Sequence, residues 1–143
     1  MINVVIVANS ALMRSVTRQV LEQFAEFRVT REAKNCISAF NFMETNWPDV
    51  VLLDTELADC NAIEFIQIIN NFRPIKIVVF ASLTFSGVEH AYRALEAGAV
   101  GVITKPTTGI ADYLKNNSEG IAKTIRVAAA KHGATSKVKI SAS

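Results

Sequence analysis

The sequence predicts an α/β fold, a doubly wound five-stranded parallel sheet built from five consecutive strand–helix units, (βα)5. Two observations predict it. Short apolar runs recur along the chain and are continuous rather than alternating, which is typical of strands that are covered on both faces. Segments with a helical spacing of apolar residues separate these runs. Because crossovers between parallel strands are right-handed, few topologies remain for such a chain.

The first unit starts at the N-terminus. Its strand is the apolar run Ile2–Val7, and a helix is predicted from Ser10. Apolar side chains in that helix share one face, opposite a polar face that carries Arg14 and Arg18. The apolar positions are Leu12, Val16, Val20, Leu21 and Phe24.

The next three units repeat this order. A weaker apolar run, Phe27–Glu32, and two stronger runs, Val50–Leu53 and Ile75–Phe80, predict their strands. The helices that follow are expected at Ile37–Thr45, Ala62–Asn70 and Gly87–Ala97.

The fifth unit has a strand at Val100–Thr104 and the last predicted helix at Ser118–Lys131. Ser118 is a candidate N-cap, Glu119 lies in the first turn, and Gly133 lies just past the end. These residue types are the ones that helix termini favour, so the bounds of this helix are well marked.

Length and composition fit one compact domain. The chain has 143 residues, of which 50% are apolar and 20% are charged, as in ordinary globular proteins. The predicted domain covers residues 1–132. Residues 133–143 are rich in Ser and small residues without periodicity, so we expect a linker or flexible tail there.

Charge and hydropathy exclude several classes of protein. The net charge of +2 is small, so nucleic acid is not an expected partner. No apolar segment approaches the length of a membrane span, which excludes a membrane protein and favours a cytoplasmic location. Cys36 and Cys60 show no metal-ligand spacing, and we expect reduced, unpaired thiols. His90 and His132 are expected to face solvent.

Ligands of a doubly wound sheet bind beyond the carboxyl ends of its strands. The residues at these ends are therefore the candidates for function. They are Ala8 and Asn9 after the first strand, Asp54 after the third, Ala81 and Ser82 after the fourth, and Lys105 after the fifth.

Three segments at these ends resemble the receiver domain of two-component response regulators. They read VVLLD at residues 50–54, FAS at residues 80–82 and ALEAGAVGVITKP at residues 94–106. The resemblance implies a flavodoxin-like fold and runs from the first strand through the last predicted helix. More narrowly, SALMRSVTRQVL, SLT and TKPTTGI are similar to the receiver half of chemotaxis protein-glutamate methylesterases.

The resemblance implies that Asp54 is the phosphoacceptor of a histidine kinase and that Lys105 contacts the phosphoryl group. The chemistry suits these roles, because a carboxylate can attack phosphorus and an ammonium group can neutralise the charge on the phosphoryl oxygens. The alternative is structural: Asp54 caps the following loop and Lys105 is its ion-pair partner.

The sequence departs from the receiver pattern at four positions. Receivers usually carry two adjacent acids after the first strand, where this chain has Ala8 and Asn9. They also carry a hydroxyl at the end of the fourth strand and an aromatic residue before the lysine, where this chain has Ala81 and Val102. Ser82 replaces the hydroxyl only if the register slips by one residue. We therefore expect a degenerate acid pocket and a degenerate switch.

These departures change the charge of the pocket. Asp54 and Lys105 cancel, while Ala8 offers no metal ligand and Asn9 only a neutral carbonyl. Glu56 could turn inward as a substitute ligand, but on an exposed loop we expect it to be solvated. Since Mg²⁺ prefers anionic oxygen, its binding through Asp54, Asn9 and Glu56 is expected to be weak or absent.

Three functions remain open. The first is a receiver-like signalling module with impaired metal-dependent phosphorylation, which acts through protein contacts. The second is a working phosphoacceptor domain at Asp54. The third is the regulatory part of a longer methylesterase, because the chain itself contains no G-x-S-x-G nucleophile motif and is not expected to be an enzyme. The expected partners are a histidine kinase or another signalling protein, an output domain, or a second copy of the chain.

Overall fold

The computed structural model describes residues 1–131. The predicted tail, residues 133–143, and His132 lie outside the described residues, so the predicted domain bounds stay a prediction. Within residues 1–131, no helix is long and apolar enough to cross a membrane.

Five parallel strands form one sheet in the order β2-β1-β3-β4-β5, which confirms the predicted doubly wound architecture. The strands are β1 (Ile2–Val7), β2 (Phe27–Ala33), β3 (Val50–Asp54), β4 (Lys76–Ser82) and β5 (Gly101–Lys105). Four of them, β2, β3, β4 and β5, extend further toward the carboxyl edge than predicted. Asp54, Ser82 and Lys105 are therefore the last residues of their strands and share the rigidity of the sheet.

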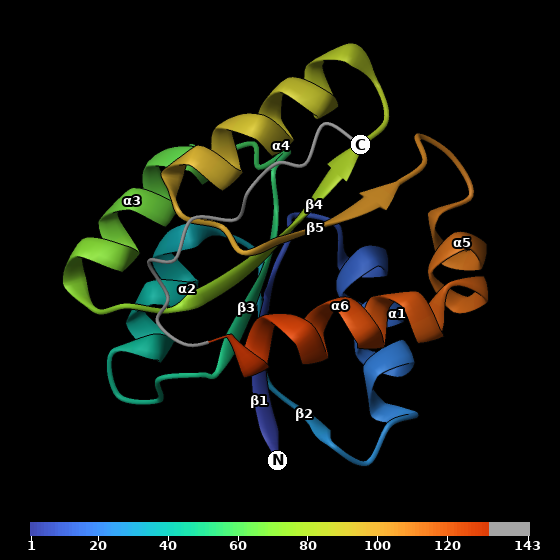
Figure 1. The fold of residues 1–143 in the computed structure, drawn as a ribbon, viewed down its shortest axis with the longest axis horizontal. Helices are drawn as coiled ribbons and strands as arrows, with labels where there is room; N and C mark the ends of the chain where they lie inside the picture. Colours follow the sequence, from blue (N-terminus) through green and yellow to red (C-terminus); the bar gives the residue numbers. More distant parts are fainter. Residues whose placement is uncertain (132–143) are drawn as a thin grey trace.

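Helices cover both faces of the sheet (Figure 1). On one face lie α1 (Ala11–Glu22), α5 (Ile110–Asn116) and α6 (Ser118–Ala130), and on the other lie α2 (Cys36–Met43), α3 (Ala62–Phe72) and α4 (Phe85–Ala97). Each face has its own apolar cluster, because alternate residues of the same strands point to opposite sides. The continuous apolar runs of the sequence are explained by this double covering.

Four helices start at the carboxyl edge of the sheet with a side-chain cap. Ser10, Asn35, Asn61 and Thr84 each accept a hydrogen bond from the backbone N–H three residues later. Such caps satisfy N–H groups that have no partner within the helix. The loops that carry the candidate site are therefore short and well anchored where each helix begins.

The helices differ from the sequence prediction in three respects. The segment after β5 forms the additional helix α5, and Asn117 rather than Ser118 is the N-cap residue of α6. Leu12 was placed on the apolar face of its helix, but its side chain is 61% exposed. For Leu12 the reason is rotation of α1, which buries Met13 and Thr17 beside Val16 and Val20.

Candidate functional site at the carboxyl edge of the sheet

The strand order brings Asp54 and Lys105 together although they are far apart in the chain. Asp54 ends β3, Lys105 ends β5, and β4 runs between them. The register aligns Asp54 with Phe80 on β4 and Lys105 with Ser82 on the same strand. Because all strands are parallel, these ends meet at one edge, where α/β proteins bind their ligands.

Asp54 and Lys105 form a buried ion pair. The Nζ atom of Lys105 lies 2.8 Å from Oδ1 and 3.0 Å from Oδ2 of Asp54. Each side chain is only 6% exposed. The backbone N–H of Glu56 also donates to Asp54 Oδ1, at 3.0 Å. Charge-assisted hydrogen bonds of this kind fix the orientation of the carboxylate.

Glu56 lies closer to this pair than expected. Its side chain is 51% exposed, yet Oε2 is 3.5 Å from Lys105 Nζ. Its exposure agrees with the expectation of a solvated side chain, and the loop in addition turns its carboxylate toward the ammonium group. The carboxylates of Asp54 and Glu56 thus both lie next to the Lys105 ammonium group.

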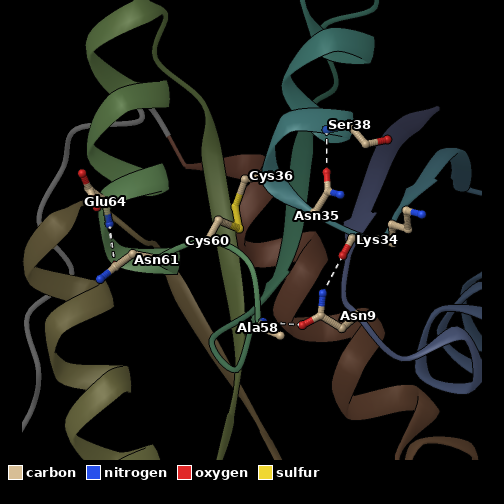
Figure 2. Close-up of a disulfide and its surroundings, with 9 residues drawn as sticks. All are labelled: Asn9, Lys34, Asn35, Cys36, Ser38, Ala58, Cys60, Asn61 and Glu64. Atoms are coloured by element: carbon tan, nitrogen blue, oxygen red, sulfur yellow. Dashed lines mark hydrogen bonds between the residues drawn. A yellow bond between two sulfur atoms is a disulfide. The ribbon is translucent and has the colours of Figure 1, made fainter.

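Asn9 joins two loops rather than pointing freely into the site (Figure 2). Its Nδ2 atom donates to the backbone oxygen of Lys34, at 2.7 Å, and its Oδ1 atom accepts from the backbone N–H of Ala58. Both ends of the amide are thus engaged by backbone groups on either side of β1. Ala8 is buried and contributes only its backbone.

Arg14 is a member of the site that the sequence prediction missed. Its guanidinium group donates to the backbone oxygens of Ala8 and Asn9, the latter at 3.0 Å. Arg14 lies on the polar face of its helix, as the sequence predicts, but the first turn of α1 points that face back toward the end of β1. The spacing of Arg14, one helical turn after the N-cap Ser10, is the signal that could have identified it.

The two switch positions lack the groups that receivers usually carry. Ala81 is buried within β4 and Val102 is half-buried beside the α4 face of the sheet. The Oγ atom of Ser82 lies 2.8 Å from Thr84 Oγ1, so its hydroxyl is engaged in the loop before α4.

The two cysteines correct the sequence prediction. Cys36 and Cys60 form a disulfide, with Cα atoms 6.3 Å apart, and are not free thiols. The expectation failed because the residues are 24 positions apart in sequence. The fold joins them: Cys36 starts α2 and Cys60 precedes the N-cap of α3, and both helices begin at the same edge of the sheet.

His90 also differs from its expected place. It is half-buried on α4, and its Nδ1 atom is buried without a hydrogen-bond partner among the described residues. Together with Thr55, Glu56, Cys60 and other residues it lines a cavity of about 450 Å³ beside the acid site.

The groups near Asp54 that could ligate a divalent cation are already engaged in hydrogen bonds or ion pairs. Within residues 1–131, no group of three or more His, Cys, Asp or Glu side chains is placed to hold a metal ion. Asp54 is already bound by Lys105, Glu56 reaches the same lysine, and the amide of Asn9 is engaged elsewhere. Mg²⁺ prefers several anionic or water oxygens in octahedral geometry, which these three residues do not supply together.

Known proteins share this arrangement of strands. The chain is 38% identical over 128 residues to a protein-glutamate methylesterase/protein-glutamine glutaminase of Pseudomonas syringae pathovar tomato, and the match covers 90% of this chain but 36% of that protein. A relative from Dechloromonas aromatica with the same kind of name gives 38% identity, with 90% and 36% covered. The chain thus spans about a third of the length of these curated relatives.

Solved structures also resemble this chain in their fold. The response regulator domain of Thermotoga maritima CheB superimposes with a TM-score of 0.83 at 30% identity, covering 92% of this chain and 98% of that one. CheY6 from R. sphaeroides, solved in complex with the P1 domain of CheA3, gives a TM-score of 0.74 at 30% identity, with 91% and 98% covered. The family model described as "Response regulator receiver domain" matches residues 4–115. From its sheet, its strand-end aspartate and lysine, and these matches, the chain belongs to the response regulator receiver domain family.

Proposed function

We propose that this domain is a receiver-like module of two-component, chemotaxis-related signalling whose metal-dependent phosphorylation is impaired. It acts through protein contacts, and its acid site stays in a single conformation. The observation that carries this proposal is the buried pair of Asp54 and Lys105, in which the lysine occupies both carboxylate oxygens of the phosphoacceptor position.

Phosphoryl transfer to Asp54 requires a nucleophilic oxygen and a stabilised transition state. In this family a divalent cation supplies much of that stabilisation. Here Ala8 offers no ligand, and Asn9 is held by Lys34 and Ala58. We therefore infer weak or absent Mg²⁺ binding, and slow or absent phosphorylation of Asp54.

The two residues that would transmit phosphorylation to the rest of the domain, Ala81 and Val102, also differ from those of typical receivers. A hydroxyl at the end of the fourth strand turns toward the phosphate in typical receivers, whereas Ala81 has none. Val102 has no aromatic ring to turn inward. A ligand shifts a two-state protein only through contacts that differ between the states, and these two positions no longer provide such contacts.

The relatives suggest the setting of this module. Two of them are named protein-glutamate methylesterases, and one structural neighbour was solved with a domain of CheA3. By this similarity we place the domain in the cytoplasm, with a histidine kinase or another signalling protein as its partner. Joined to an esterase domain, a receiver of this kind would regulate that domain by contact.

Intact mass after incubation with acetyl phosphate and Mg²⁺ tests the proposal. We expect no covalent phosphoryl group on the wild-type chain under conditions that fully modify the receiver domain of Thermotoga maritima CheB as a positive control. The Asp54→Asn variant, which has no phosphoacceptor, sets the background. Stoichiometric modification of the wild type that disappears in Asp54→Asn would overturn the proposal.

A working phosphoacceptor is the second candidate, and Glu56 is the observation that favours it. Its carboxylate lies 3.5 Å from Lys105 Nζ, so it could supply a negative ligand beside Asp54. An NMR titration with millimolar Mg²⁺ separates the two candidates. Chemical-shift changes at Asp54 and Glu56 that saturate with Mg²⁺, and that are absent in the Glu56→Gln variant, would favour the working phosphoacceptor.

A further inference from the structure

The disulfide lies next to the acid site, at the far end of the loop that carries Glu56. Cys36 is the first residue of α2, and Cys60 lies in the loop of residues 55–61 that joins β3 to α3. We propose that Cys36 and Cys60 form a redox modification site. Its substrate class is dithiol reductants, and its reduction releases the β3–α3 loop from α2.

The ion pair of Glu56 with Lys105 and three further attachments hold the loop in the described structure. At its start, both the backbone N–H and the hydroxyl of Thr55 donate to Phe80 O, at 3.1 and 3.0 Å. In its middle, the backbone N–H of Ala58 donates to Asn9. At its end, Cys60 is bonded to Cys36 (Figure 2). The last of these is the only covalent one.

The attachments on the β1 and α2 side are few. Among the described residues, the hydrogen bond to Asn9 is the only one that joins residues 56–61 to β1, β2, α2 or the loops between them. Ala58 and Asp59 are exposed, while Leu57 and Cys60 are packed against the apolar cluster under α2 and α3. Without the disulfide, one exposed hydrogen bond and this packing must hold the loop, and exposed loops with few contacts open most readily.

The position of the loop decides the make-up of the acid site. Glu56 contributes its N–H to Asp54 and its carboxylate to Lys105 from the first residues of this loop. A loop that moves away from α2 weakens both contacts, and it also opens the cavity that Cys60, Glu56 and His90 line. The redox state of the pair is therefore coupled to the site by a segment of a few residues.

The greater solvent exposure of Cys60 favours attack of the reductant on its sulfur atom. Cys36 is buried, whereas Cys60 is half-buried and lines that cavity. A thiolate of the dithiol attacks Cys60 Sγ and forms a mixed disulfide, while Cys36 leaves as a thiolate and takes up a proton. The second thiolate of the reductant then attacks the reductant sulfur that is bonded to Cys60. A disulfide forms within the reductant, and Cys60 leaves as a thiolate and takes up the other proton. Two electrons and two protons pass from the dithiol, which becomes a disulfide, to the two cysteines.

A disulfide that is reduced and formed again fits the proposed location better than a permanent structural disulfide. This step rests on the cytoplasmic location proposed above, since disulfides in that compartment are mostly transient and redox-sensing. The pair joins two loops at the functional edge rather than two elements of the core. Its reduction changes that edge and leaves the sheet in place.

Hydrogen exchange read by mass spectrometry tests the proposal without using phosphorylation. The purified chain is oxidised or treated with dithiothreitol, its free thiols are then alkylated to fix each state, and the exchange of residues 55–61 is compared. We expect exchange in this loop to become about tenfold faster on reduction. Exchange in β1 and β4 should stay unchanged. The double variant Cys36→Ala with Cys60→Ala should exchange quickly under both conditions.

Three results would overturn the proposal. The first is complete alkylation of both thiols in the oxidised sample, which means that no disulfide forms. The second is a disulfide that dithiothreitol reduces only after the protein is unfolded by urea. The third is equal exchange of the loop in the oxidised and reduced states. None of these results depends on whether Asp54 is phosphorylated, so a failure here is distinct from a failure of the proposed function.

Discussion

At the scale of single residues, the replacement of an acid by Asn9 has a structural use. An amide has both a donor and an acceptor, so it can donate to Lys34 O and accept from Ala58 N–H at the same time. A carboxylate could only accept and would leave Lys34 O without this partner. Asn9 therefore joins the loop that follows β2 to the loop that follows β3.

Acids at residues 8 and 9 should provide metal ligands and remove the hydrogen bond that Asn9 donates to Lys34. In the double variant Ala8→Asp with Asn9→Asp, Asp54 and two new carboxylates face the same edge, and we expect Mg²⁺ binding in the millimolar range and modification by acetyl phosphate. The lost donor to Lys34 should lower the free energy of unfolding by about 1 kcal/mol. NMR titration and urea unfolding measure these two effects. Asn9→Ala is the control for metal binding, because it adds no ligand; it removes the hydrogen bond from Ala58 as well as the one to Lys34. Equal Mg²⁺ affinity in both variants would contradict the explanation.

At the scale of elements, helix α4 shows how closely the strand ends and the helices fit. Its first turn carries Gly87, which is buried against the end of β4. A Cβ atom at this position would overlap the backbone oxygen and the hydroxyl of Ser82. The close approach of α4 to β4 therefore requires a residue without a side chain, although glycine is a poor helix former.

This fit predicts opposite effects of the same substitution in two helices. Gly87→Ala should destabilise the domain by about 1–3 kcal/mol, because the backbone of β4 must move to admit the methyl group. Gly120→Ala in α6 should stabilise it by about 1 kcal/mol, since a Cβ there meets nothing within 4 Å and alanine favours the helix. Urea unfolding of both variants measures the difference. A stabilising Gly87→Ala would show that α4 is not held against Ser82.

At the scale of the whole molecule, much of the fold followed from local patterns. Nearly continuous apolar runs identified four of the five strands, because a strand covered on both faces has few polar positions to interrupt it. The edge strand β2, FRVTREA, alternates buried and exposed residues and gave only a weaker run. Asp54 and Lys105 were found because they follow such runs. Their meeting required only that parallel strands end at one edge.

Other features depend on contacts between distant segments and left no local signal. The cysteine pair needs the positions of α2 and α3, the tie from Asn9 to Ala58 needs the loop conformation, and the turn of Glu56 toward Lys105 needs both. Helix α5 was missed because its seven residues are too few for a clear apolar period. Sequence patterns do not give the conformation of loops, and the parts of the site that were missed involve the loop residues Asn9, Glu56 and Cys60.

The last described helix closes the molecule through contacts with segments far away in the chain. Lys76 Nζ donates to Ala129 O at 2.9 Å, and Lys131 Nζ donates to Val100 O at 3.1 Å. Arg126 forms two hydrogen bonds with Glu26, 100 residues earlier, one of them at 3.0 Å. These contacts fix α6 beside α1 and the edge of the sheet, so they tie the end of the domain to its beginning.

The pair of Glu26 and Arg126 predicts a pH-dependent contribution to stability. The hydrogen bond from Arg126 lowers the pKa of Glu26 below its ordinary value, against a smaller opposing effect of burial. In the unfolded chain this bond is absent, so the unfolded state binds the proton more readily. The stabilisation is therefore present at neutral pH, above the unfolded-state pKa, and is lost as the pH falls through the lower folded-state pKa.

Urea unfolding of the wild type and of Glu26→Gln measures this contribution as a difference, which cancels the other carboxyl groups that titrate in the same range. We expect the wild type to be the more stable at neutral pH, by a small amount because the pair is at the surface, and the two proteins to converge in acid. Added salt should reduce the difference at neutral pH. Glu44→Gln is the matched control, because Glu44 is exposed and has no ion pair among the described residues. A difference for Glu26→Gln that persists unchanged in acid would mean that packing of the side chain, rather than its charge, joins the two ends of the domain.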